Sequence, residues 1–120
     1  MQANTNINER VYTFPAALDF ETINVSALKA HPEMVRSFSG ELTVYQKGGT
    51  NFQVFVQTDV PFLRLTTFQA DLKDRFGIRV EIIPEQLKGG EINGSIFIAT
   101  NDPEFPRLVV PAKALVQGNW

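Results

Sequence analysis

Two apolar runs near the C-terminal end of the chain constrain its fold more than any other feature. Ile92–Ala99 and Leu108–Val116 place apolar side chains at alternate positions, which is typical of a strand buried on at least one face. The segment between them, Asn-Asp-Pro-Glu-Phe-Pro, holds turn formers and prolines that donate no hydrogen bond to a sheet. We therefore expect these runs to form a β-hairpin within an antiparallel β-sandwich.

Similar alternating segments, separated by turn signals at roughly 8–12-residue spacing, run through the rest of the chain. Because proline is confined to an edge or a bulge, the first segment is expected to pair with one sheet before Pro15 and with the other sheet after it. With the closing hairpin, these segments predict an all-β, immunoglobulin-like antiparallel sandwich of about seven strands. The predicted strands are Val11–Val25, Val35–Gln46, Phe52–Gln57, Phe62–Thr67 and Ile78–Ile83.

The predicted core lies between the two sheets. Its centre is expected to contain Ile82, Ile96, Ile98 and Val110, which occupy alternating positions in the best-defined strands. The segments between strands read as loops. Ser26–Pro32 is expected to hold one helical turn, Phe68–Phe76 to cross between strands with a possible turn of helix, and Pro84–Leu87 to pack Leu87 against the core.

The composition of the chain fits one globular domain. Its 120 residues match the usual size of a single core, and 43% hydrophobic with 20% charged residues is too apolar for disorder. We expect the polar residues 1–10 to be a disordered or frayed lead-in. Residues 11–118 are then expected to form a single immunoglobulin-like sandwich.

Charge and cysteine content narrow the classes of partner. The formal net charge of −2 gives no basic footprint for nucleic acid, and no stretch reaches the ~20 apolar residues needed for membrane insertion. The chain has no cysteine, which excludes disulfides, thiolate metal sites and cysteine nucleophiles. Neither nucleic acid nor membrane insertion is therefore expected.

Residues suited to catalysis or metal binding are few and scattered. His31 is the only histidine and lies beside a proline in a loop-like segment. Asn101-Asp102-x-Glu104 comes closest to a cation-binding loop, but such side chains also close turns by accepting from their own backbone. The acidic pairs Glu81/Glu85 and Asp71/Asp74 are expected on solvent faces. We therefore predict no catalytic, metal or cofactor site, and no enzyme.

Several short segments resemble the ASH/hydin-like immunoglobulin-like domains, which are related to the major sperm protein and PapD folds and to uncharacterised bacterial domains. Pro15 followed by Leu18-Asp19-Phe20 is similar to the first strand of that group, although Glu21 stands where glycine is usual. The closing hairpin is similar at Gly94–Ile98, Thr100–Pro103 and Val110–Val116. The resemblance implies a non-catalytic scaffold or docking module, usually part of a larger protein. Cysteines found in some bacterial members are missing here, so no ligand role attached to them transfers.

The expected function is an interaction or structural module that holds a protein partner, or an adjacent domain of the same polypeptide, through a sheet face or edge. Phe62–Thr67 carries Arg64 as its only charge and no proline, so as an edge strand it would be poorly guarded against pairing. Phe62, Arg64 and Thr66 are therefore candidate partner-binding residues. The alternative is that Phe68–Phe76 covers this edge.

Aromatic side chains supply the remaining candidates. Phe105 and Trp120 are possible platforms for a partner, and Trp120 follows the last strand, where it either folds back or stays exposed. The alternative function is a carbohydrate-binding module on the same sandwich. That function needs several coplanar exposed rings, and the additional candidates Tyr12 and Tyr45 do not share a strand with them.

Overall fold

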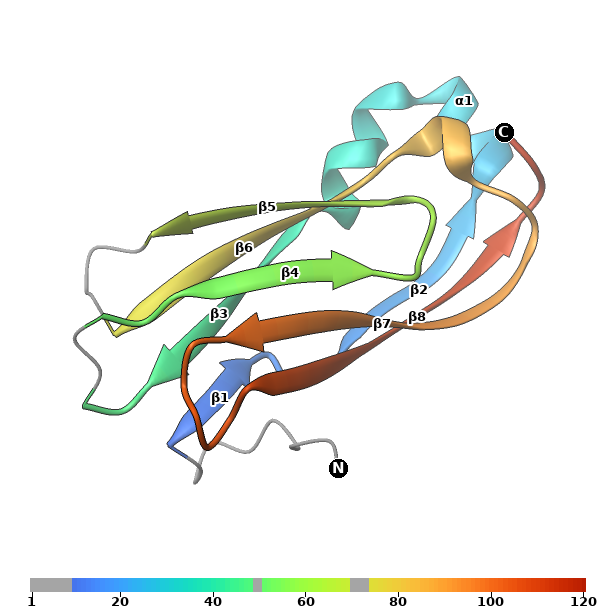
Figure 1. Ribbon diagram of the computed structural model, residues 1–120. Helices are drawn as coiled ribbons and strands as arrows, with labels where there is room; N and C mark the ends of the chain where they lie inside the picture. Colours follow the sequence, from blue (N-terminus) through green and yellow to red (C-terminus); the bar gives the residue numbers. More distant parts are fainter. Residues whose placement is uncertain (1–9, 49–50, 70–73) are drawn as a thin grey trace.

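The computed structural model describes residues 10–48, 51–69 and 74–120, and it consists mostly of β-strands (Figure 1). One short α-helix, α1 (Val25–Ala30), and two 3₁₀ helices, η1 (Pro32–Phe38) and η2 (Pro84–Gln86), join them. No helix within these ranges is long and apolar enough to cross a membrane. The strands are β1 (Val11–Phe14), β2 (Leu18–Asn24), β3 (Gly40–Gln46), β4 (Val54–Thr58), β5 (Leu63–Gln69), β6 (Arg75–Ile82), β7 (Gly90–Thr100) and β8 (Arg107–Gln117).

The strands form two packed four-stranded sheets, which confirms the predicted sandwich. Sheet A has the order β2-β8-β7-β4, and sheet B has the order β1-β3-β6-β5. The predicted closing hairpin is also confirmed, because β7 and β8 pair antiparallel along most of their length. The described residues form eight strands rather than about seven because the interruption at Pro15 divides the first one.

β1 and β2 are edge strands of the two sheets, and the chain changes sheet at Pro15, as predicted. β1 pairs antiparallel with β3 in sheet B, and after Pro15 the chain crosses to sheet A as β2. The β2–β8 pair is parallel, so the expected antiparallel arrangement does not hold there. The reason is that β2 continues in the direction of β1 and reaches the edge of sheet A beside a strand that runs the same way (Figure 1).

The core between the sheets is formed by the inward-facing side chains of both. Ile82, Ile96, Ile98 and Val110 are all buried, as predicted, and Ile96 lies opposite Val110 in the β7–β8 ladder. One end of the core is covered by α1 and η2. Leu87 is buried directly after η2, which confirms the packing predicted for it.

The expected strand Val35–Gln46 is wrong in its first part. Pro32 begins η1 instead, at the first helical turn where proline is tolerated, and β3 begins only at Gly40. Val35 and Phe38 are three positions apart, so a helical turn directs both towards the core, against which they pack. The mixture of polar and apolar residues before Gly40 therefore reflects one face of a helical turn and not the alternation of a strand.

β5 and β6 are longer than predicted because Gly77 does not end a strand. Phe68 places its ring where a β-carbon of residue 77 would stand, so the aromatic side chain covers the glycine from the neighbouring strand. Pairing therefore continues to Gln69 and resumes at Arg75. The crossing segment expected over Phe68–Phe76 is therefore wrong at both of its ends, which belong to β5 and β6. Its residues 70–73, the part left for the expected helical turn, lie outside the described residues.

Candidate functional site

The expected edge strand lies at an edge, but its residues divide between the core and the surface. Among the described strands, β5 has only β6 as a neighbour in sheet B. Arg64 and Thr66 lie on its exposed outer face. Phe62 precedes the strand and is only 2% exposed, so its ring is part of the core and is inaccessible to a partner. The prediction for Phe62 is wrong because Phe62 lies in the turn before β5, which starts at Leu63, so the alternation of the strand does not direct its side chain.

Within the described part of the chain, the sandwich has a second open edge on the same side, at β4. β4 is the last strand of sheet A and lies beside β5 across the gap between the sheets (Figure 1). We call this side, consisting of β4, β5 and the outer face of sheet A next to β4, the open side. β1 and β2 occupy the opposite edges of the two sheets.

The open side carries the most exposed large apolar side chain of the described residues. Phe55 on β4 is 76% exposed, and Phe97 on β7 is 41% exposed. Both project from the outer face of sheet A, where Val109 is the neighbour of Phe97 in the next strand. Solvent-exposed apolar groups gathered in this way mark interaction surfaces more often than scattered single residues do.

A groove of about 1060 Å³ follows the free edge of β4. Val54, Val56 and Leu65 line it from the space between the sheets. Phe55 and Phe97 line it from the outer face of sheet A. The groove therefore wraps around both sides of one strand. The partner-binding predictions did not include β4. Its sequence, Val-Phe-Val-Gln-Thr, has no proline and no charge, whereas β5 carries Arg64.

The aromatic candidates are already engaged within the domain. Phe105 packs partly buried against the core, with the Arg10 guanidinium 6.0 Å from its ring centre. Trp120 folds back: its backbone N–H donates to Leu87 O (3.0 Å), and the Lys29 ammonium lies 5.6 Å from its ring centre.

Tyr12 and Tyr45 are cross-strand neighbours on the outer face of sheet B. Their rings stack with centres 4.9 Å apart and planes inclined by 15°. Lys47 lies over Tyr12 and Arg75 lies over Tyr45. Each ring therefore has an aromatic or cationic neighbour on its faces, which are the surfaces that a sugar would need for stacking.

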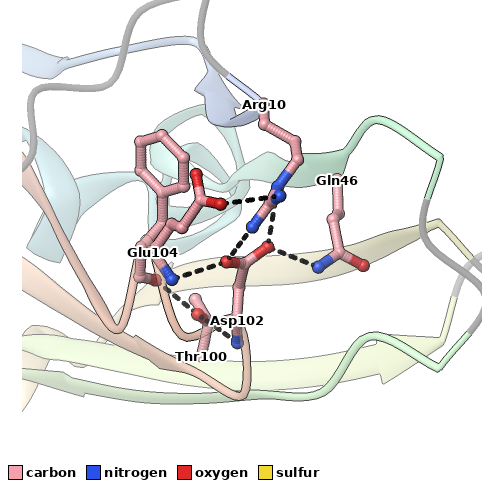
Figure 2. A network of polar contacts seen from close by, with 6 residues as sticks. Arg10, Gln46, Thr100, Asp102 and Glu104 are labelled. Atoms are coloured by element: carbon pink, nitrogen blue, oxygen red, sulfur yellow. Dashed lines mark hydrogen bonds and ion pairs between the residues drawn. The ribbon is translucent and has the colours of Figure 1, made fainter.

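A network of polar contacts joins the two sheets at one end of the sandwich (Figure 2). Asp102, in the loop between β7 and β8, has a side chain that is almost completely buried. Arg10 donates to both of its carboxylate oxygens, and Gln46 Nε2 donates to Oδ2 (2.6 Å). The Glu104 backbone N–H donates to Oδ1 (2.9 Å), as the turn-closing role predicted. This network therefore connects the start of β1, the end of β3 and the loop between β7 and β8.

Comparison with known proteins identifies a fold but no family. No protein-family model matches the sequence, and no curated protein does. A solved protein of unknown function from Porphyromonas gingivalis W83 has a similar fold, with a TM-score of 0.63 and 16% sequence identity. The match covers 88% of this chain and 46% of that one, so this chain spans about half the length of that protein. The chain is a β-sandwich of the same kind.

The Arg10–Asp102 pair has shifted pKa values with identifiable causes. Burial raises the pKa of the Asp102 carboxyl, but hydrogen bonds from Arg10, Gln46 and the Glu104 backbone outweigh it and hold that pKa below its ordinary value. The hydrogen bond to Asp102 raises the pKa of Arg10. Arg10 was expected to belong to a frayed lead-in of residues 1–10; it is held by this pair, and residues 1–9 lie outside the described residues.

Replacing Asp102 by asparagine is expected to lower Tm at pH 7 and to change its pH dependence. Because the folded-state pKa of Asp102 is depressed, the stabilisation it provides is complete above the unfolded value of about 3.9 and is lost as the pH falls through the folded value. The difference in Tm between wild type and Asp102→Asn should therefore be constant near neutral pH. It should shrink as the pH is lowered from about 5 to below 4.

Thermal unfolding measured between pH 3 and pH 8 checks this expectation, with Glu104→Gln as the control. Glu104 also pairs with Arg10 (3.2 Å) but is exposed, so its neutralisation should change Tm much less at pH 7. Parallel Tm profiles for wild type and Asp102→Asn would show that the carboxylate charge contributes nothing to stability.

The structure places the other described acidic residues and the single histidine in no metal-ligand cluster. Among the described residues, no three or more His, Asp or Glu side chains lie close enough to hold a metal ion. His31 is exposed between α1 and η1, with its Nδ1 3.4 Å from Glu33. Asp74 pairs with the adjacent Arg75 (3.1 Å), and Asp71 lies outside the described residues.

Proposed function

We propose that this chain is a non-catalytic interaction module that holds a protein partner, or a neighbouring domain, through the open side of the sandwich. The observation that carries the proposal is the exposure of Phe55 and Phe97 beside an unpaired strand edge. Such an edge presents free N–H and C=O groups together with apolar side chains, which is the combination that strand-pairing and face-packing partners use.

The contrast between the two sides of the sandwich supports this choice. On the opposite side, where β1 and β2 are the edge strands, the chain crosses from one sheet to the other at Pro15, and proline is one of the devices that block edge pairing. On the open side, β4 pairs with β7 in an unbroken register and carries no charge. An exposed apolar edge of this kind promotes aggregation of an isolated protein, whereas in a binding module the partner covers it.

The ASH/hydin-like assignment belongs to the same proposal, and one backbone feature supports it. Glu21 has a φ of 57°, in the left-handed region that favours glycine. This is the position at which the related first strand carries glycine, immediately after Leu18-Asp19-Phe20. The Glu21 N–H donates to Asp19 Oδ1 (2.8 Å), so a local turn holds this conformation in place of glycine.

Affinity capture from extracts of the source cells tests the proposal with matched variants. Phe55→Lys should abolish capture of the partner, because a charge replaces the central apolar contact. Phe14→Lys is the control: Phe14 is 65% exposed on the outer face of sheet B, so the same chemical change is made on the opposite sheet. The control should retain the partner, and both variants should keep the wild-type Tm.

Two results would contradict the proposed surface. Loss of the partner with Phe14→Lys but not with Phe55→Lys would place the interaction on sheet B. Recovery of the same proteins by wild type and Phe55→Lys would show that the open side binds none of them. Purified partner and isothermal titration then provide the affinity of the direct interaction.

A further inference from the structure

We propose that β4 binds its partner by strand addition, and that the occupant is an extended partner segment with apolar side chains at alternate positions and a carboxylate among the side chains between them. This inference rests on the proposed function and names the chemistry of the partner at that site. It requires free backbone groups on β4, space on both sides of an added strand, and a positive charge within reach. The structure provides each of these.

The free backbone groups follow from the hydrogen bonds at the two ends of β4. Asn101 N–H donates to Gln53 O, and Asp59 N–H donates to Ser95 O. Residues on one strand of an antiparallel pair alternate between facing the neighbour and facing away. The backbone N–H and C=O groups of the odd-numbered residues of β4 therefore point towards β7. Those of Val54, Val56 and Thr58 point away from β7, at the free edge of the sheet.

The groove along β4 has the shape that an added strand would fill. Side chains of a strand alternate between the two faces of its sheet. One set of side chains from an added strand would enter the groove between the sheets, against Val54 and Leu65. The other set would lie on the outer face, beside Phe55 and Phe97. Val54, Val56 and Leu65 make the inner wall largely apolar, so apolar residues on the inner side of the partner fit best.

A positive charge in the groove indicates which side chain the outer side of the partner segment should carry. Arg107 is the one charged residue among those lining the groove in the described part of the chain. It shares a row with Phe55, through Ala99, across the outer face of sheet A. Arg107 is exposed and makes no ion pair with any other described residue. A partner carboxylate that reaches into the groove on the outer side would be attracted to it, whereas a lysine would be repelled.

The neighbouring edge at β5 is less suited to this role. Its outer face carries Arg64, a charge at an edge position, and Phe68, which covers Gly77 and lies 5.8 Å from the Arg79 guanidinium. By the same alternation, the outward-facing amides in the middle of β5 are those of Leu65 and Thr67, because Ile83 N–H donates to Phe62 O. The two edges can therefore be distinguished by which amides a partner protects.

Amide exchange with synthetic peptides tests the inference on the full chain. The probe is a capped peptide of nine residues that alternates threonine and valine, with the central threonine replaced by glutamate. One control peptide has lysine in place of this glutamate, and a second has proline in place of the valine next to it. At millimolar probe, exchange at Val54, Val56 and Thr58 should slow at least tenfold, while Phe55 and Gln57 should be protected with or without peptide.

The peptide series and matched variants separate backbone pairing from charge. The glutamate peptide should bind about 2- to 5-fold more tightly than the lysine peptide, as expected for an exposed charge pair, and Arg107→Ala should remove that preference without preventing binding. The proline peptide should not bind, because it lacks a ladder donor. Arg64→Ala, on the other edge strand, should change nothing.

Each contrary result has a definite meaning. No slowing at Val54, Val56 and Thr58 with millimolar probe would refute strand addition at β4. Protection of Leu65 and Thr67 instead would assign the site to β5. Slowing that rises with protein concentration alone would show that a second copy of the chain is the occupant. If capture of a partner requires Phe55 but the β4 amides still exchange fast in the complex, strand addition is refuted and the interaction function stands.

Discussion

Replacing Ile96 by alanine is expected to lower the free energy of unfolding by about 2–5 kcal/mol, the range for large-to-small changes in a packed core. Ile96 is fully buried at the centre of β7, opposite Val110 and between the two sheets. The loss combines the transfer free energy of the removed methyl and methylene groups with the cavity that remains, because strands paired on both sides cannot collapse into the space.

Denaturant unfolding followed by fluorescence or circular dichroism measures this loss, with Phe55→Ala as the control. Phe55 also lies within a strand of sheet A, but it is exposed, so its truncation should cost less than about 1 kcal/mol. Equal losses for the two variants would mean that the burial assigned to the inner face is incorrect.

Replacing Gly94 by alanine is expected to cost about 1–3 kcal/mol or more, by overpacking. A β-carbon at position 94 would overlap the side chain of Val60 and stand 2.7 Å from Asp59 Oδ1. Val60 is buried, and Asp59 accepts a hydrogen bond from the Ser95 N–H (2.8 Å), so neither neighbour can move without a loss of its own. Gly94 therefore permits the connection between β4 and β5 to pack closely on β7.

Gly40→Ala is the matched control for this prediction. Gly40 also lies in a strand, but a β-carbon there would meet no atom within 4 Å, and its backbone is not in the left-handed region. Its replacement should be neutral or should stabilise the fold by up to about 1 kcal/mol, through the reduced entropy of the unfolded chain. Similar destabilisation in both variants would point to a general cost of replacing strand glycines, rather than to the contact with Val60.

Features with a local signal in the sequence were predicted correctly. The closing hairpin and the core positions Ile96 and Val110 follow from alternation, which a strand buried on one face imposes on its own residues. The switch between sheets follows from Pro15, because proline lacks the donor that a continuous ladder needs. Where alternation was ambiguous, as at Val35 and Phe38, a spacing of three residues in a helical turn was mistaken for a strand.

Contacts between residues far apart in the sequence were not predicted. Arg10 and Asp102 are separated by 92 positions, and nothing local to either residue indicates their pairing. Alternation places Phe55 on the face opposite to Val54 and Val56, but only the sheet order shows that β4 has a free edge beside it. The same sheet order places β5 at an edge, as expected.

The parallel pairing of β2 with β8 has a mechanical consequence. Arg10 is held beside the loop from which β8 starts, and Trp120 follows the end of β8, so the two points are separated by about the length of an 11-residue strand, roughly 35 Å. A pull that separates these points acts along β1 and β2 in one direction and along β8 in the other. The β2–β8 hydrogen bonds are then loaded in shear and must break together, unlike the bonds of a hairpin, which open one after another. The crossing from β1 to β2, which creates this parallel pair, is therefore expected to make the domain resist stretching in this direction.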